Sequence, residues 1–108
     1  GAYRYRRYKP NPKNGDAKAA RLALPPEVNR ARLDNTVEAV WLGRDLINTP
    51  ASDLGPAEIE TAVRSVAARH GATVRSVVGD DLLLQNFPMI HAVGRASPRP
   101  PRLIELDW

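Results

Sequence analysis

Two prolines in the middle of the chain, Pro50 and Pro56, constrain the fold most, because each marks a helix boundary. Pro50 follows Asn48 and Thr49, and the residue before a proline is pushed out of the helical conformation. Pro56 follows Gly55 and suits the first position of a new helix, where its missing N–H has no intrahelical partner to lose. The sequence therefore predicts one helix that ends near Asn48, a short joint, and a second helix that begins at Pro56.

The spacing of apolar residues supports both helices. Between residues 28 and 48 they recur at steps of three and four, which is typical of an amphipathic helix: these residues are Leu33, Val37, Val40, Trp41 and Ile47. The second helix has one apolar face formed by Ile59, Ala62, Val63, Val66 and Ala67. Gly71 follows as a left-handed C-cap, which ends this helix.

After Gly71 the apolar period changes from 3.6 to two residues, which indicates strands. Residues 73–78 and 102–108 are predicted strands, and residues 79–84 form a short helical turn. The apolar run 90–93 is interpreted as a short buried strand. We therefore predict an α/β fold in which two helices precede a short three-stranded portion of a larger mixed sheet.

Prolines also divide the chain. Residues 1–27 are expected to form a tail or linker, because Pro10, Pro12 and the Pro25-Pro26 pair interrupt any apolar period. Residues 28–108 form the folded part. A strand at 90–93 would need cover on both faces, and no helix follows Trp108 to supply it. We therefore expect the 108-residue chain to be a fragment of a larger domain.

Basic charge is concentrated near the start of the chain. Residues 1–30 carry eight Lys and Arg against two acids, whereas the other 78 carry eight basic and ten acidic residues. Residues 3–9, YRYRRYK, interleave aromatic and basic side chains, a pattern that could stack bases and neutralise phosphates. The other interpretation, which we favour, is the frayed end of a preceding element whose tyrosines packed on a part of the protein that is absent from this chain. No apolar run reaches the length that a membrane span requires.

Candidate metal ligands are sparse. The chain has no cysteine, which excludes disulfides and thiolate metal sites and fits a reducing compartment. His70 is interpreted as a cation at a helix C-terminus, and His91 as a hydrogen-bonded core residue. Asp80 and Asp81 follow a glycine and are interpreted as an N-cap and a first-turn acid. We assign no metal ligand in this chain.

Candidate nucleophiles and acid–base pairs are equally sparse. The serines Ser52, Ser65, Ser76 and Ser97 lack the G-x-S-x-G setting of a nucleophile elbow. Glu58 and Glu60, two apart on a helix, do not face one another as a carboxylate pair would. No glycine-rich phosphate loop is present. We therefore assign no catalytic residue and no cofactor-binding residue.

Longer stretches resemble a known family. Residues 38–58, EAVWLGRDLINTPASDLGPAE, resemble the helix, Asn-Thr-Pro-Ala-Asn loop and next helix that open the catalytic domain of the leucyl aminopeptidase (cytosol aminopeptidase) family, with Ser52 in place of the usual asparagine. Residues 78–97 and 101–106 resemble that family's next elements in the same order. Residues 3–9 are similar to the end of the N-terminal domain in its bacterial members.

The resemblance implies a metalloenzyme, a hydrolase and protease that removes N-terminal residues from peptides. Two divalent ions, zinc or manganese, would activate a water and polarise the scissile carbonyl. The family's ligands and catalytic residues occupy motifs such as Gly-Lys-Gly and Asp-Thr-Gly-Gly, which are absent here, so no site residue is carried over. The resemblance also implies a hexamer in the cytoplasm.

Two functional hypotheses follow. In the first, residues 1–27 end the N-terminal domain and connect it to residues 28–108, which begin the catalytic domain of a metal-dependent aminopeptidase. This fragment alone would then bind no metal and be inactive. Under this first hypothesis we expect neither a nucleic acid nor a membrane as a partner. In the second hypothesis, the chain is a small nucleic-acid-binding module that uses the Tyr/Arg-rich segment 3–9.

Overall fold

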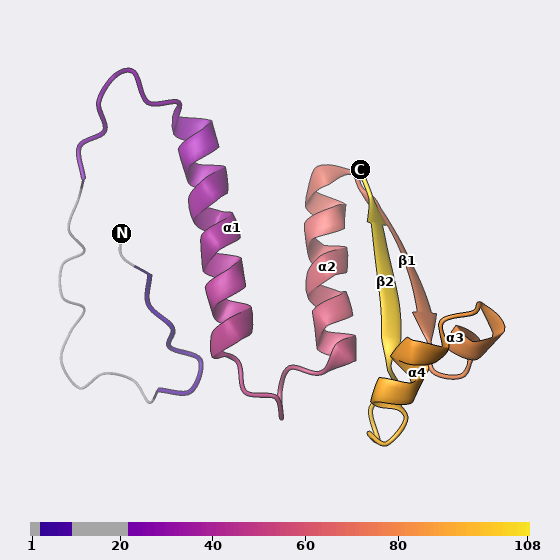
Figure 1. Cartoon of the computed structure of the whole chain (residues 1–108). Coiled ribbons are helices and arrows are strands. Elements are labelled where there is room, and N and C mark those ends of the chain that lie inside the picture. Colours follow the sequence, from indigo (N-terminus) through magenta and orange to yellow (C-terminus); the bar gives the residue numbers. More distant parts are fainter. Residues whose placement is uncertain (1–2, 10–21) are drawn as a thin grey trace. The chain divides into compact units, whose positions relative to one another are not determined.

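A computed structural model of the chain describes residues 3–9 and 22–108 (Figure 1). It divides into two compact units, the N-terminal unit Gly1–Asn48 and the C-terminal unit Thr49–Trp108. The part of the predicted linker at residues 10–21, with Pro10 and Pro12, lies outside the described residues. No helix within the described part is long and apolar enough to cross a membrane.

The N-terminal unit contains one helix, α1 (Arg30–Asn48). Its first turn is capped by Asn29, whose side-chain oxygen accepts a hydrogen bond from the backbone N–H of Arg32 at 3.0 Å. The helix ends at the predicted residue, Asn48, just before Thr49 and Pro50. None of its residues is buried, although their apolar spacing is that of a helix with a buried face.

The C-terminal unit begins with α2 (Pro56–His70), and both of its ends agree with the sequence prediction. Pro56 lies in the first turn, and the Glu58 carboxylate accepts a hydrogen bond from the N–H of Gly55 at 2.8 Å. Gly71 has φ 69°, the left-handed conformation that favours glycine. Its N–H donates to the carbonyl of Ala67 and closes the last turn.

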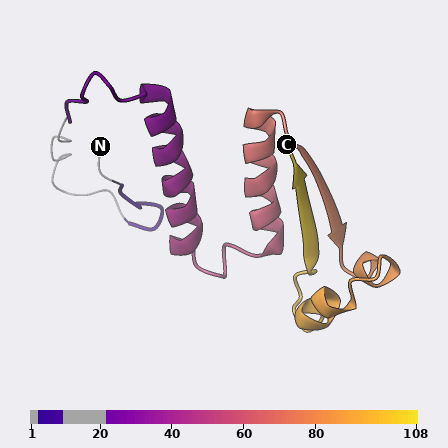
Figure 2. The same cartoon turned by 45° about the horizontal axis from the view of Figure 1, so that its top comes forward.

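Strands β1 (Thr73–Val78) and β2 (Arg102–Asp107) form a two-stranded antiparallel sheet. The register runs from Thr73 opposite Asp107 to Val78 opposite Arg102. Helix α2 lies alongside the sheet, as Figures 1 and 2 show. The chain between the strands leaves and re-enters the sheet at one end, where the N–H of Gly79 donates to the carbonyl of Pro101 at 2.8 Å.

Two short helices, α3 (Asp81–Leu84) and α4 (Pro88–Gly94), fill the excursion between β1 and β2. The first is the predicted helical turn. The second corrects our prediction, because residues 90–93 are helical and the sheet has two strands in the described chain rather than three. Pro88 in the first turn is the physical reason: its fixed φ suits a helix start.

The small core lies in the C-terminal unit. Leu82 of α3 is fully enclosed, and Val77 of β1 and Ala67 of α2 are each 3% exposed. Large apolar side chains elsewhere remain open to solvent, including Val93 at 86% and Trp108 at 93%.

Candidate functional site

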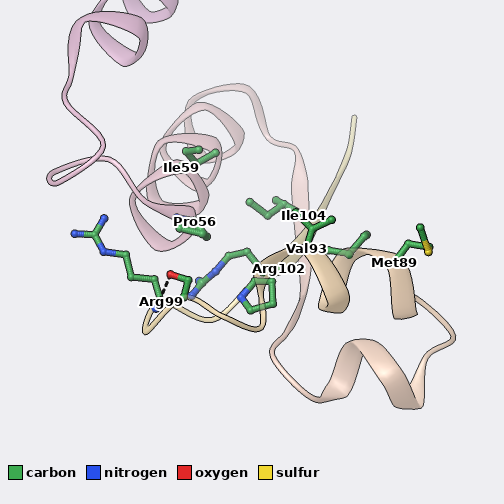
Figure 3. A pocket seen from close by; sticks show the side chains of 11 residues that line it. Pro56, Ile59, Met89, Val93, Arg99, Arg102 and Ile104 are labelled. Atoms are coloured by element: carbon green, nitrogen blue, oxygen red, sulfur yellow. Dashed lines mark hydrogen bonds between the residues drawn. The ribbon is translucent and has the colours of Figure 1, made fainter.

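A groove of about 630 Å³, which we call the apolar groove, opens on the C-terminal unit (Figure 3). Seven apolar residues line most of it: Pro56, Ile59, Met89, Ile90, Val93, Pro101 and Ile104. Ser97, Arg99 and Arg102 are its polar members. Its volume falls within the usual range for ligand sites.

Three elements build the walls. Helix α2 contributes Pro56 and Ile59 from its first turns, α4 contributes three apolar side chains, and β2 contributes Ile104. The end of α4 packs directly on the loop before β2: a Cβ added at Gly94 would lie 2.4 Å from the Cβ of Pro101. Since backbone and a proline ring cannot move aside easily, this approach requires glycine at position 94.

Arg99 ties the loop before β2 to the joint before α2. Its guanidinium donates to the carbonyl of Ala51 at 3.0 Å and also to the carbonyl of Ser52. It also lies 3.9 Å from the Glu58 carboxylate. Figure 3 shows the Arg99 side chain extending away from the apolar side chains of the groove. The guanidinium therefore serves to hold two loops together at one end of the groove.

A second polar cluster joins α2 to both strands. The Glu60 carboxylate, 8% exposed, accepts a hydrogen bond from Arg102 at 2.5 Å and one from the Ser76 hydroxyl at 2.9 Å. Arg64, one helical turn further on, donates to the same carboxylate at 2.8 Å. The Nε of Arg102 is enclosed and has no acceptor among the described residues. We call Glu60, Arg64, Ser76 and Arg102 the Glu60 cluster.

These contacts change the acidity of two carboxyl groups. Hydrogen bonds from Arg102, Arg64 and Ser76 to the ionised form lower the pKa of Glu60 to about 2. The pKa of Glu58 is also lowered, because the backbone N–H groups of Glu58 and Gly55 donate to its carboxylate. Both groups are therefore ionised hydrogen-bond acceptors at neutral pH. Neither is suited to act as a general acid there.

Two of the residues considered as metal ligands, His91 and Asp80, lie together. His91 on α4 lies 3.1 Å from the Asp80 carboxylate, with the histidine 19% and the aspartate 95% exposed. Asp80 does precede α3, but its side chain makes no capping bond within that helix. The ring of His70 contacts that of Trp108 edge-on, with the centroids 6.4 Å apart. Across residues 3–9 and 22–108, no three side chains of His, Asp or Glu are grouped as a metal site.

The candidate serines serve the scaffold. Ser76 belongs to the Glu60 cluster, and the Ser97 hydroxyl accepts the N–H of Arg99 at 3.1 Å. Ser52 contributes its backbone carbonyl to the Arg99 contact. Ser65 lies on an exposed position of α2. Glu58 and Glu60, which do not form a carboxylate pair, each bind different partners.

Sequence reasoning missed the Glu60 cluster and the role of Arg99. A signal for the cluster was available, because Glu60 shares its helical face with Val63 and Ala67, three and seven residues on. Likewise, Arg102 lies two residues before Ile104 and so on the same face of the strand. When two apolar faces that pack together each carry one charged residue, and the charges are opposite, an ion pair between the two residues is predicted. Arg99 lies in a loop, where no periodicity indicates a partner.

In the N-terminal unit, Tyr3 packs on α1. Its hydroxyl donates to Asp45 at 2.6 Å and accepts from the Asn48 amide at 3.1 Å. Its ring lies 6.5 Å from that of Trp41 and 5.5 Å from the Arg44 guanidinium. Partial burial and the bond to Asp45 raise the pKa of Tyr3 above its usual value. Tyr3 therefore packs on a helix of this chain, whereas the sequence interpretation expected the tyrosines to have packed on a part that is absent from it.

Comparisons with known proteins show which family the C-terminal part of the chain matches. A family model described as "Cytosol aminopeptidase family, catalytic domain" matches residues 41–108. Peptidase B of Klebsiella pneumoniae is 40% identical over 85 residues, which are 76% of this chain and 20% of that protein. A probable cytosol aminopeptidase of Corynebacterium glutamicum is 42% identical over 72 residues, or 67% of this chain and 14% of the relative.

A solved structure shares the local fold. The crystal structure of a cytosol aminopeptidase from Coxiella burnetii superposes with a TM-score of 0.69 and 48% sequence identity. The superposition covers 73% of this chain and 17% of the Coxiella chain. This chain therefore spans a fifth or less of the length of the proteins it matches.

Proposed function

This chain belongs to the cytosol aminopeptidase family, and from that premise we propose that it supplies the start of the catalytic domain of a metal-dependent aminopeptidase. The enzyme would remove N-terminal residues from peptides. Residues 28–108 would begin that domain, and residues 1–27 would end the preceding domain and connect the two. The observation that carries the proposal is the family match over residues 41–108.

The described residues do not fit a metal site. The carboxylates with lowered pKa, Glu58 and Glu60, are engaged by backbone N–H groups and by arginines. His91 has one acidic neighbour, Asp80, where a zinc site would need three or four ligands. We therefore propose that the two divalent ions, zinc or manganese, are held by residues of the enzyme beyond this segment. No catalytic step is assigned to the residues described here.

The proposed contribution of this segment is to support the rest of the domain. The Glu60 cluster connects α2 to β1 and β2, and Arg99 connects the joint before α2 to the loop before β2. Charge-assisted hydrogen bonds of this kind hold elements in one geometry. A rigid two-stranded sheet with its helix is the kind of scaffold on which catalytic residues elsewhere in a domain can be positioned.

The assembly and location of the enzyme are part of the same proposal. Its substrates would be peptides, and its oligomer a hexamer, as the family resemblance implies. Two matched proteins are named cytosol aminopeptidases, which supports a cytoplasmic location.

A chimera tests the proposed function. The matched segment of the Corynebacterium relative is replaced by the corresponding residues of this chain, and hydrolysis of leucine amide analogues is followed with added Mn²⁺ or Zn²⁺. We expect metal-dependent turnover by the chimera and none by the 108-residue chain alone. Turnover by the isolated chain would mean that the active site had been placed wrongly, and an inactive but folded chimera would contradict the proposal.

The nucleic-acid hypothesis has a direct test of its own. If Arg4, Arg6, Arg7 and Lys9 neutralise about four phosphates, the slope of log affinity against log salt should be about −3 to −4. Because Tyr3 is already packed on α1, we expect negligible binding to single-stranded or duplex DNA at either of two salt concentrations. Binding with the stated slope would restore this hypothesis.

A further inference from the structure

We propose that the apolar groove seats an apolar segment from the remaining part of the catalytic domain and is covered in the intact enzyme. This inference rests on the proposed function, because it takes the partner to be the rest of a cytosol aminopeptidase catalytic domain. It goes further by identifying which surface of this chain meets that partner.

Exposure of the groove walls is the first argument. Val93 and Met89 are 86% and 76% exposed, and Ile59 is 42% exposed, although all three line one continuous groove. Leaving apolar surface in water forfeits roughly 25 cal/mol for each Å². Contiguous apolar patches on a protein surface therefore usually mark an interaction site.

The polar members of the groove argue for an apolar partner. Arg102 is paired with Glu60, and Arg99 donates to the carbonyls of Ala51 and Ser52. Both cations are thus already engaged by partners within the unit. The groove therefore offers packing surface rather than charge recognition, which disfavours a phosphate or a nucleic acid.

The openness of the walls argues for a protein segment over a small ligand. Sites for small molecules usually enclose most of the ligand surface. Here two of the main wall residues, Val93 and Met89, have most of their own surface in solvent. Such walls suit the face of a helix or sheet laid across them.

The solved relative points to the source of such a segment. Its chain shares the fold over 73% of this chain at 48% identity. This segment makes up 17% of that chain, and the rest belongs to the same polypeptide. A covalently joined remainder has a high effective concentration at this surface compared with any free partner.

Thiol labelling can test this placement, because the chain contains no cysteine. Val93→Cys places a thiol on the groove wall, and Leu84→Cys places one on α3 outside the groove. The two parent side chains are 86% and 84% exposed, which makes the second variant a matched control. In the isolated chain we expect both thiols to react with a maleimide at similar rates.

In the chimera with the Corynebacterium relative, we expect labelling at position 93 to slow by at least about ten-fold, while labelling at position 84 stays unchanged. Equal, fast labelling at both positions in a folded chimera would overturn the inference. Should the chimera not fold, cysteines at the aligned positions of the intact Corynebacterium enzyme carry the same test with the same two outcomes.

The test also separates a second copy of this chain from the remainder of the domain. Protection at position 93 that rises with the concentration of the isolated chain, together with a sedimenting dimer, would overturn the proposal in favour of self-association. Activity distinguishes the two proposals: an active chimera with a reactive position 93 rejects the groove assignment alone. An inactive, folded chimera with position 93 protected rejects the proposed function alone.

Discussion

The two long helices of the chain share a sequence pattern and differ in what they bury. Helix α1 has 19 residues and no buried side chain, whereas α2 has 15 residues and buries Glu60 and Ala67. Both carry apolar residues at steps of three and four. The difference is that α2 lies against β1 and β2 within its own unit (Figure 2). An amphipathic pattern thus predicts a helix, while burial requires a partner surface.

Ion pairs in the two units also differ in how exposed their side chains are. In the N-terminal unit, Arg30 and Asp34 form an ion pair with side chains 75% and 53% exposed. In the C-terminal unit, Arg102 and Glu60 pair with side chains 15% and 11% exposed. Exposed pairs contribute little to stability, but breaking an enclosed one leaves a charge without compensation. We therefore expect substitutions to have larger effects in the C-terminal unit.

The largest expected effect is at Leu82, the one fully enclosed large side chain described. Leu82→Ala should destabilise the C-terminal unit by about 2 to 5 kcal/mol, because the small core cannot fill the cavity. Urea unfolding followed by circular dichroism measures the change. Leu84→Ala, on the same short helix but 84% exposed, is the control and should change stability by less than about 0.5 kcal/mol. Equal effects of the two variants would contradict the assigned core.

The next effect concerns Glu60 and is pH-dependent. Its folded-state pKa, about 2, lies below the usual glutamate value of 4.5, so ionised Glu60 stabilises the fold above pH 4.5, and this contribution is lost as the pH falls toward 2. Glu60→Gln should therefore lower the urea midpoint clearly at pH 7, and the gap to the parent chain should narrow at pH 3. Asp34→Asn, in the exposed pair of α1, should leave the midpoint nearly unchanged at both pH values. A gap that widened on acidification would disprove the stabilising role.

Replacing glycine by alanine should change stability in opposite directions at one position in each unit. An added Cβ meets no atom within 4 Å at Gly71 or at Gly43, so only backbone conformation distinguishes the two positions. Gly71→Ala should destabilise the C-terminal unit by about 1 to 2 kcal/mol, because alanine is strained at φ 69°. Gly43→Ala, inside α1, should stabilise that helix by about 0.5 to 1 kcal/mol. Amide hydrogen exchange of each unit would show both changes, and destabilisation by both variants would be the contrary result.

The smallest effect is expected at Tyr3. Tyr3→Phe removes the hydroxyl that bonds Asp45 and Asn48 but keeps the ring near Trp41. Because these contacts are exposed, hydrogen exchange in the last turns of α1 should quicken less than it does around Gly71 in Gly71→Ala. Tyr3→Ala, which also removes the ring, should have a larger effect. No change with Tyr3→Ala would show that residues 3–9 do not support α1.

Local signals in the sequence predicted most of the element boundaries. Pro50, Pro56 and Gly71 act on their own backbone and immediate neighbours, so the end of α1 and both ends of α2 were predictable. The run 90–93, Ile-His-Ala-Val, was assigned wrongly because a short, mainly apolar run suits a strand or a buried helix equally. The decisive signal is Pro88 in the first turn of α4, because the fixed φ of proline suits a helix start.

Sequence alone determined the end of α1, both ends of α2 and which family the chain resembles, because backbone restrictions and ordered motifs are properties of neighbouring residues. Tertiary structure alone decided the pairing of β1 with β2, the enclosure of Glu60 by Arg102, Arg64 and Ser76, and the apolar groove. Apart from the Glu60–Arg64 pair, which is one helical turn apart, each of these joins residues that are distant in the sequence. Such contacts depend on which faces meet in space, and residue spacing along one element does not specify that.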